Sequence, residues 1–353
     1  MSKIIFTFIR FIIIIILNLN MTENEPIDIV IPWVDGNNVE WQERYKQYAK
    51  LSKDGDKRVI RFRDWGLLRY WFRGIECFAP WVRKIHFITS GELPEWLDIN
   101  HPKIHWVRHE DYIPKEYLPT FSSRTIEVNL HRIEGLSEKF IYVNDDMFLL
   151  REAPISDFFR NGLPCDSAVL DPIFPIESPE LFTNGIMAIN RNFNKNMVIR
   201  KNLSKWINLK YGGFLIKSLL LLPWKKFPGL LGHHLHQSFR KKTFEEVWTA
   251  EPDLLRNAGI TRFRYYKDVN QWIFRYWHLA KGEFSPVNKF TDGKNVDITT
   301  DTIDDICNII RMQKCKQICI NDSENITDFD GLSKKIQSAF NSILPQKSSF
   351  EKE

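Results

Sequence analysis

Three polar residues, Asn144, Asp145 and Asp146, directly follow a short apolar run near the middle of this 353-residue chain. The run, Phe140 to Val143, consists of aromatic and branched residues, which is typical of a central strand buried on both faces. Ligands of open α/β sheets bind at the carboxyl ends of such strands. Adjacent carboxylates repel each other unless a cation offsets their charge, and oxygen ligands of this kind suit Mg²⁺ or Mn²⁺. The alternative is a plain polar turn, because Asn and Asp are common turn residues.

The segment before this run predicts a helix that ends at Gly135, a residue that tolerates the left-handed conformation found after helices. Ile126, Leu130 and Ile133 recur at helical spacing and form one apolar face. Glu127 lies on the adjoining face of the same predicted helix.

Two further segments could contact a nucleotide. Residues 27–34 predict a first strand, and Asp35 in the turn after it can bond a ribose hydroxyl or a base, although a plain β-turn explains it equally well. Residues 61–78 predict a helix in which Arg69 and Arg73 are four positions apart. These two arginines can face a diphosphate, or they can be solvated or paired with nearby acids.

A histidine loop and an arginine pair follow in the second half of the chain. His233, His234 and His236 are close in sequence, but no spaced cysteine or carboxylate supports a zinc cluster, so a single catalytic histidine is favoured. Arg262 and Arg264 alternate in a short extended run, which predicts that both lie on one side. Two such guanidinium groups can clamp a phosphate, or they can form ordinary surface ion pairs.

The composition narrows the class of protein. Hydrophobic residues make up 43% and charged residues 26% of the chain, which is normal for a globular protein. The net charge of +5 is compatible with anionic substrates or a membrane surface, and no nucleic-acid-binding motif is present. The five cysteines form no CxxC pair, which argues against a zinc site and predicts reduced thiols in a cytoplasmic protein.

Predicted strands alternate with predicted helices, with further strands at 82–90 and 104–107, so we expect an α/β fold with a mainly parallel sheet. The first residues are apolar but shorter than a membrane span, and they fit a weak anchor, a signal fragment or an extension ahead of a start at Met21. The expected segments are an apolar extension (1–21), an α/β core (22–194), a basic and apolar insertion (195–231), a C-terminal part (232–345) and a disordered tail (346–353).

The insertion is unusual in its charge. Between Lys195 and Lys226 the chain has eight lysines and arginines, no acidic residue, and many interleaved leucines and tryptophans. Such a segment predicts contact with a membrane surface. A buried helical insertion whose lysines extend to solvent is the alternative.

Taken together, these motifs resemble the Stealth family of sugar-1-phosphate transferases, which act in capsule and exopolysaccharide synthesis and include the lysosomal-enzyme N-acetylglucosamine-1-phosphotransferase. The resemblance covers about residues 27–324 and is most specific in the second of four blocks. The blocks are IDIVIPWVDG at 27–36, the stretch from RFRDWGLLRYWFRGIE to HRIEGLSEKFIYVNDDMFL at 61–149, the histidine loop through RFRYYKDVNQ at about 234–280, and ICINDSE at 318–324.

The resemblance implies an α/β fold related to the GT-A type of nucleotide-sugar transferases, and a divalent metal, Mg²⁺ or Mn²⁺. It implies transfer of a hexose-1-phosphate, usually N-acetylglucosamine-1-phosphate, from a UDP-sugar to a saccharide or lipid-linked polysaccharide acceptor, with release of UMP. The protein would then be cytoplasmic, or peripheral at the inner face of the plasma membrane. The implied residues are Glu127, Asp146, His234 and Arg264 in catalysis, Asp35, Asn144 and Arg69 in donor binding, and Asp145, Asp146 and Asp322 at the metal.

Two points stay open at the level of sequence. The family usually has His-x-Pro in its third block, whereas position 236 is His here, so any of His233, His234 and His236 can be the functional one. Two other activities also fit the residues: a metal-dependent glycosyltransferase that releases UDP, and a non-catalytic saccharide-binding assembly protein.

Overall fold

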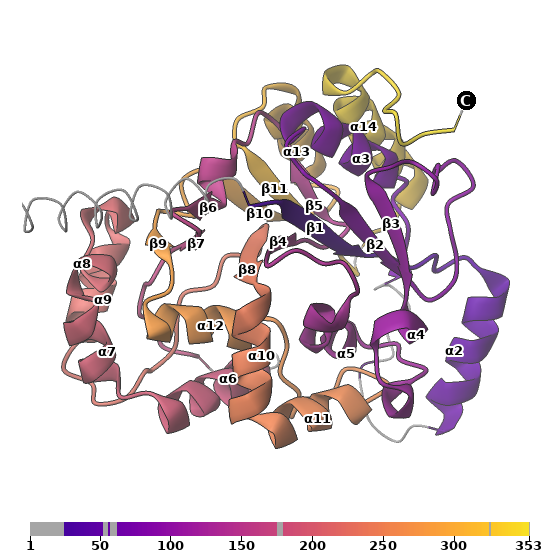
Figure 1. Ribbon diagram of the computed structural model, residues 1–353. Helices are drawn as coiled ribbons and strands as arrows, with labels where there is room; N and C mark the ends of the chain where they lie inside the picture. Colours follow the sequence, from indigo (N-terminus) through magenta and orange to yellow (C-terminus); the bar gives the residue numbers. More distant parts are fainter. Residues whose placement is uncertain (1–24, 52–55, 57–61, 175–178, 325, 353) are drawn as a thin grey trace, which may run out of the picture.

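The computed structural model describes residues 25–51, 56, 62–174, 179–324 and 326–352. A five-stranded sheet with the order β3-β2-β1-β4-β8 lies at the centre of the molecule (Figure 1). Strands β1 to β4 are parallel, and β8 pairs antiparallel with β4 at one edge. The predicted α/β class with a mainly parallel sheet is therefore confirmed. The strands are β1 Ile27–Pro32, β2 Ile85–Thr89, β3 Ile104–Arg108, β4 Lys139–Tyr142 and β8 Gln237–Arg240.

Both faces of this sheet are covered, because side chains alternate along each strand. In β4 and just after it, Ile141 and Val143 belong to one hydrophobic cluster, and Phe140 and Tyr142 belong to the other. The prediction of a strand buried on both sides is thus confirmed. Helices α3 (Leu68–Phe78), α13 (Ile303–Arg311) and α14 (Phe329–Ile343) cover the first face (Figure 1). The opposite face packs against α5 (Ser123–Val128), α6 (Pro179–Asn192), α10 (Lys241–Ala250), α11 (Pro252–Ile260) and α12 (Trp272–Lys281).

A second sheet adjoins the first and has the order β10-β11-β5. Only residues 143–146 separate β4 from β5, so the Asn-Asp-Asp motif lies where the chain passes from one sheet to the other. The remaining strands and helices are β5 Met147–Leu149, β6 Phe159–Arg160, β7 Leu163–Asp166, β9 Ser285–Pro286, β10 Gly293–Asp297, β11 Gln317–Asn321, α2 Val39–Leu51 and α4 His109–Tyr112.

The two predicted helices before the motif are shorter than expected. The helix predicted at 61–78 begins only at Leu68, because Gly66 has φ +70° and Asp64 accepts a hydrogen bond from its amide in a turn. The helix that should reach Gly135 ends at Val128. There the Asn129 side chain donates to the Thr125 carbonyl, and the backbone tightens into a 3₁₀ turn.

One other expectation is wrong. The tail predicted to be disordered is ordered as far as residue 352, because Phe350 is only 2% exposed and packs on Phe72. Glu351 in the tail also accepts hydrogen bonds from Arg73 at 2.7 and 2.9 Å.

The basic insertion forms a group of short helices, α7 (Lys195–Lys201), α8 (Leu203–Trp206) and α9 (Phe214–Leu220), at one side of the molecule (Figure 1). Lys195 is buried and donates to the carbonyls of Leu221, Leu222 and Trp224. Among the described residues, no helix has the length and apolar character needed to cross a bilayer. The apolar extension at 1–21 lies outside the described residues, and all five cysteines are unpaired.

Candidate functional site

A large cavity of about 1270 Å³ lies at the carboxyl ends of β1 and β4. Its walls combine segments that are far apart in the sequence, namely the ends of both strands, the start of α5, the histidine loop, the segment before α12 and the end of β11. Seven of the predicted site residues line it: Glu127, Asn144, Asp145, Asp146, His234, Arg264 and Asp322.

The two adjacent carboxylates lie on the floor of this cavity. Asp146 is held in place through its backbone carbonyl, which accepts a hydrogen bond of 3.0 Å from the Ile320 amide of β11. Burial raises the pKa of Asp146 to about 6. The Asp145 side chain is exposed to the space of the cavity. Desolvation by the surrounding protein, together with the charge of the neighbouring Asp146, raises the pKa of Asp145 to about 7. The raised pKa values show that the ionised form of each carboxyl group is unfavourable without a counter-charge. A bound cation would supply that charge and would replace the protons.

The residues fit a divalent metal ion. Among the described residues, no hydrogen-bond partner exists for the buried Oδ1 atom of Asp146. Ligand atoms of Asp146, His234 and Cys319 lie within 4.8 Å of one another. Asp146 with Asp145 beside it offers the oxygen ligands that Mg²⁺ and Mn²⁺ prefer, and the His234 imidazole lies close to them.

Sequence reasoning missed Cys319, because the absence of a CxxC pair directed attention away from cysteines. Cys319 lies in β11, directly opposite Met147 of β5. Met147 is the residue that follows Asp146 in the sequence. Burial raises the pKa of the Cys319 thiol, so this residue offers a neutral sulfur atom. A buried cysteine just before an Asn-Asp pair was the signal available in the sequence.

Asp322 lines the same cavity but has a different partner from the one predicted. Both of its carboxylate oxygens accept hydrogen bonds from Arg63, one of them at 2.8 Å from Nε. A bidentate pair of this kind already neutralises the carboxylate. The structure thus places Asp322 in the wall, and the group of possible metal ligands does not include it.

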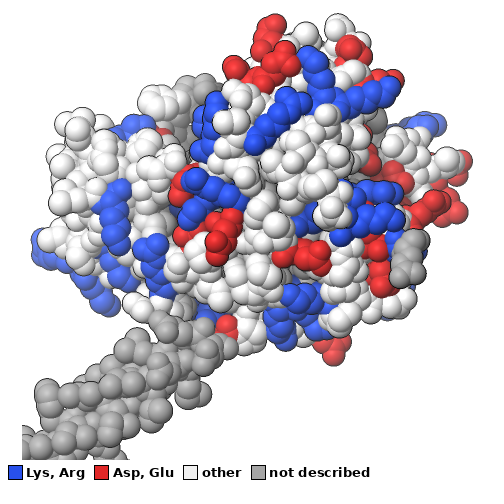
Figure 2. All heavy atoms as spheres, turned by 90° about the horizontal axis from the view of Figure 1, so that it is seen from above, with Lys and Arg blue, Asp and Glu red and all other residues white. Residues whose placement is uncertain are grey.

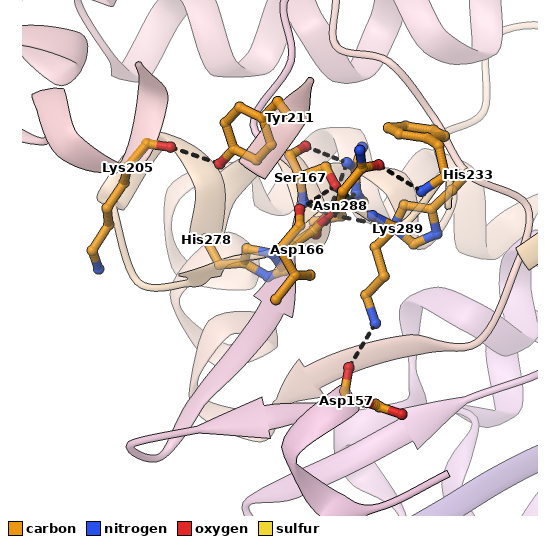
Figure 3. A network of polar contacts seen from close by, with 12 residues as sticks. Asp157, Asp166, Ser167, Lys205, Tyr211, His233, His278, Asn288 and Lys289 are labelled. Carbon is orange, nitrogen blue, oxygen red and sulfur yellow. Dashed lines mark hydrogen bonds and ion pairs between the residues drawn. The ribbon is translucent and has the colours of Figure 1, made fainter. Parts of the chain in front are cut away.

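The structure distinguishes the three histidines. His234 faces the cavity, whereas His236 is buried at 1% exposure. His233 points the other way, with its Nε2 atom 3.3 Å from Asp166 in the interior (Figure 3). Burial, followed by the charge of Arg264, lowers the pKa of His234, so its imidazole is neutral and can accept a proton near neutral pH.

Glu127 is connected to the motif through the hydroxyl of Tyr142. This hydroxyl lies 3.0 Å from Oε1 of Glu127 and 2.6 Å from Oδ1 of Asn144. The other carboxylate oxygen of Glu127 accepts from the Gln271 amide at 3.4 Å. Burial raises the pKa of Glu127 even though Arg264 opposes the shift. The Tyr142 hydroxyl has one proton, which it can donate either to Glu127 or to Asn144. A protonated Glu127 could donate to the Tyr142 oxygen while Tyr142 donates to Asn144, so that both contacts would be hydrogen bonds.

Only one arginine of the predicted pair reaches the cavity. Arg264 lines it and donates to Ser123 Oγ at 3.0 Å. Arg262 is exposed, stacks over the ring of Tyr48 and lies outside the lining. The prediction of a two-arginine clamp from this run is therefore wrong.

Asp35 and Arg69 are not brought into the cavity lining. The Asp35 carboxylate accepts the Asn37 amide at 2.9 Å and stabilises its own turn. Arg69 lies 4.0 Å from Glu351 and over the ring of Trp96. The Glu351 carboxylate of the ordered tail attracts both Arg69 and Arg73. The structure therefore corrects the prediction that Arg69 faces a diphosphate.

A buried polar network behind the histidine loop was not predicted. At its centre Asp166, 4% exposed, accepts from Nε of Arg275 at 3.0 Å and lies 3.0 Å from Nε2 of His278 (Figure 3). Burial opposes the charge of Asp166, but Arg275 and the two histidines outweigh it and hold its pKa well below the ordinary value. This network fixes His233, the residue next to His234.

Comparison with known proteins gives the class to which this fold and site belong. Family models described as "Stealth protein CR1, conserved region 1" and "Stealth protein CR2, conserved region 2" match residues 25–52 and 61–165. The chain is 42% identical to the capsular polysaccharide phosphotransferase WcwK of Streptococcus pneumoniae, over 94% of this chain and 100% of that protein. It is 40% identical to the exopolysaccharide phosphotransferase cps2G of Lactiplantibacillus plantarum, over 92% of this chain and 96% of that protein.

Another relative is the receptor polysaccharide phosphotransferase WefC of Streptococcus gordonii, which is 37% identical over 93% of this chain and 99% of that protein. The chain is thus a phosphotransferase, and it belongs to the Stealth family. Among solved structures, mouse xyloside xylosyltransferase 1 matches 83% of this chain and 97% of its own with a TM-score of 0.35 and 9% identity, which is too low to support an argument.

Proposed function

We propose that the protein transfers a hexose-1-phosphate, of which N-acetylglucosamine-1-phosphate is the first candidate, from a UDP-sugar to a hydroxyl of a saccharide or lipid-linked polysaccharide, with release of UMP. The process it serves is capsule or exopolysaccharide synthesis, at the cytoplasmic side of the membrane. The observation that carries the proposal is the convergence of Glu127, Asp146, His234 and Arg264 in one cavity. About 1270 Å³ is large enough for a nucleotide sugar together with an acceptor.

The roles of the residues follow from the needs of phosphoryl transfer, which depends mainly on positioning and on charge stabilisation. Asp146, with Asp145 beside it, would hold Mg²⁺ or Mn²⁺, and such an ion would neutralise charge on a diphosphate. Arg264 is placed to stabilise the oxygens of the transferred group. His234 takes the proton of the acceptor hydroxyl, since its imidazole is neutral, and Glu127 is the second candidate for this base.

The released nucleotide tests the proposal. Transfer of the sugar with its phosphate breaks the bond between the two phosphorus atoms and releases UMP, whereas an ordinary glycosyltransferase releases UDP. The purified protein is incubated with a panel of UDP-sugars, a polysaccharide acceptor fraction and Mn²⁺, and the nucleotide is identified by chromatography. We expect UMP. Release of UDP would establish the glycosyltransferase alternative, and no turnover of any donor would favour the non-catalytic one.

Replacement of the proposed base gives a second prediction. His234→Gln is expected to lower kcat about 10²- to 10⁴-fold, the usual contribution of a general base. Because the pKa of His234 lies below its ordinary value of 6.5, the imidazole is neutral above that pKa and becomes protonated as the pH falls. At saturating metal the unmodified protein should therefore lose activity on the acid side of pH 6.5, and the residual activity of the variant should not. His101→Gln, which alters a histidine against the ordered tail, is the control.

A further inference from the structure

Exposed apolar side chains gather on the helices of the insertion. Eight of the sixteen large hydrophobic residues that are exposed in the described part of the chain lie between Met197 and Trp224. A single exposed leucine is ordinary, but a contiguous group of this size marks an interaction surface. We define the insertion face by its six main side chains, Leu203, Leu209, Ile216, Leu219, Leu220 and Trp224, which are 57%, 88%, 63%, 43%, 75% and 47% exposed.

Helix α9 buries a polar residue against the body of the protein and leaves an apolar face exposed. Its buried residue is the polar Ser218, whose hydroxyl accepts the Leu170 amide at 3.0 Å. Ile216, Leu219 and Leu220 have the spacing of one helical face, and all three are exposed. An amphipathic helix of a soluble protein normally does the reverse and buries its apolar face. Within the described part of the chain, the outward apolar face of α9 therefore lacks the cover that the fold gives to its other helices.

The insertion itself contributes only positive charge, and Asp171, which pairs with Lys217, comes from outside it. The sequence has no acidic residue from Lys195 to Phe244, and among the described residues Arg200, Lys201 and Lys225 form no ion pair. In Figure 2 the side occupied by α7 to α9 in Figure 1 shows Lys and Arg among uncharged residues, without Asp or Glu in view. Over the rest of that view the two signs are mixed.

We propose that the insertion face docks on an anionic lipid bilayer. Leucine, isoleucine and tryptophan side chains enter the boundary between headgroups and acyl chains, and lysine and arginine contact the anionic headgroups. Charge complementarity favours lipid over a second copy of this chain, because two such faces in contact would bring the cations Arg200, Lys201 and Lys225 of one copy against those of the other.

Helix α9 of the insertion face is linked directly to the cavity wall. Lys217 of α9 forms an ion pair of 2.6 Å with Asp171, and Asp171 lines the cavity. The cavity wall next to Asp171 is apolar and includes Ile173 and Leu230. The inference goes beyond the proposed function, and vesicle binding measures it independently of any turnover.

The apolar part of the proposal is tested with Leu209→Gln, Ile216→Gln and Leu220→Gln combined in the full chain. We expect at least about tenfold weaker sedimentation with phosphatidylglycerol vesicles, because three inserted side chains are lost. The matched control combines Val39→Gln, Ile260→Gln and Met312→Gln, which are 67%, 56% and 67% exposed on other parts of the surface. Circular dichroism and thermal unfolding verify the fold of both.

The cationic part is tested with Arg200→Gln, Lys201→Gln and Lys225→Gln against a control with the same charge change, Lys314→Gln, Lys334→Gln and Lys347→Gln. The first set should weaken binding to phosphatidylglycerol vesicles about tenfold or more and leave binding to phosphatidylcholine vesicles unchanged. The proposal is overturned if the unmodified protein does not bind anionic vesicles, if either test set binds as strongly as its control, or if the apolar substitutions abolish self-association and leave vesicle binding intact.

Discussion

Asp146→Asn is expected to reduce turnover at least about a thousandfold while the protein stays folded. The Oδ1 atom of Asp146 is buried in the cavity wall and lacks a hydrogen-bond partner among the described residues, and the carboxylate lies with His234 and Cys319 in the group of possible metal ligands. An amide keeps the shape of the side chain but removes the negative charge that binds the cation. Loss of about 4 kcal/mol of charge stabilisation corresponds to a thousandfold in rate.

Two measurements check this result. Turnover is followed by nucleotide release, and Mn²⁺ binding is followed by electron paramagnetic resonance, which reports on the site without depending on the reaction. Asp301→Asn, which neutralises an exposed acid outside the cavity, is the control and should retain both. Turnover or Mn²⁺ affinity of Asp146→Asn within a few fold of the unmodified protein would show that this carboxylate is not the ligand.

The same substitution should leave the metal-free protein as stable or more stable at neutral pH. Burial raises the pKa of Asp146 from 3.8 to about 6, so the folded state binds this proton more tightly than the unfolded state. The ionised carboxylate therefore destabilises the metal-free fold above pH about 6, and the penalty fades as the pH falls toward 3.8. The melting temperature of Asp146→Asn should thus exceed that of the unmodified protein at pH 8, and the two should converge at pH 4.

The parts of the fold that were predictable from sequence are those that local pattern determines. The run from Phe140 to Val143 is apolar on both faces because both faces are covered, and the polar residues after it must lie at the strand end. The assignment of Glu127, His234 and Arg264 to the same site depended on family resemblance, since no local pattern shows that a helix, a loop and an extended run meet. The cavity brings them together as the resemblance implied.

Three of the errors share one physical origin, which is competition from a partner distant in sequence. Arg69 has the spacing for a diphosphate site, but the tail brings Glu351 to it. Asp322 has the appearance of a second metal ligand, but Arg63 already pairs with it. The tail itself has a polar composition, but the packing of Phe350 against Phe72 and the hydrogen bonds from Arg73 to Glu351 order it. In each case the deciding contact joins residues more than 200 positions apart.

The buried network around Asp166 was missed for the same reason, although α12 contained a signal. Arg275 and His278 lie three positions apart in a helix whose residues from Trp272 to Ala280 are all buried. A buried arginine requires an acidic partner, because an unpaired charge in the interior is very unfavourable. That partner, Asp166, lies at the end of β7, 109 positions earlier in the chain.

Asp166→Asn is expected to destabilise the protein by about 3–5 kcal/mol, the usual result of removing one partner from a buried ion pair. The asparagine has the same shape but leaves Arg275, 1% exposed, with an uncompensated charge in the interior. Urea unfolding followed by tryptophan fluorescence measures the change. Asp330→Asn, on the exposed side of α14, should stay within about 0.5 kcal/mol of the unmodified protein.

The double variant Asp166→Asn with Arg275→Met separates charge from packing. If the loss arises from an unpaired buried cation, removing that cation should restore part of the stability, since apolar replacements of buried pairs are often neutral or better. If the double variant is less stable than Asp166→Asn alone, the network contributes through shape and hydrogen bonds, and the charge argument is wrong. Because Asp166 also fixes His233, turnover of the single variant at a temperature where it is folded should fall as the neighbouring His234 loses its position, by about ten- to a hundredfold.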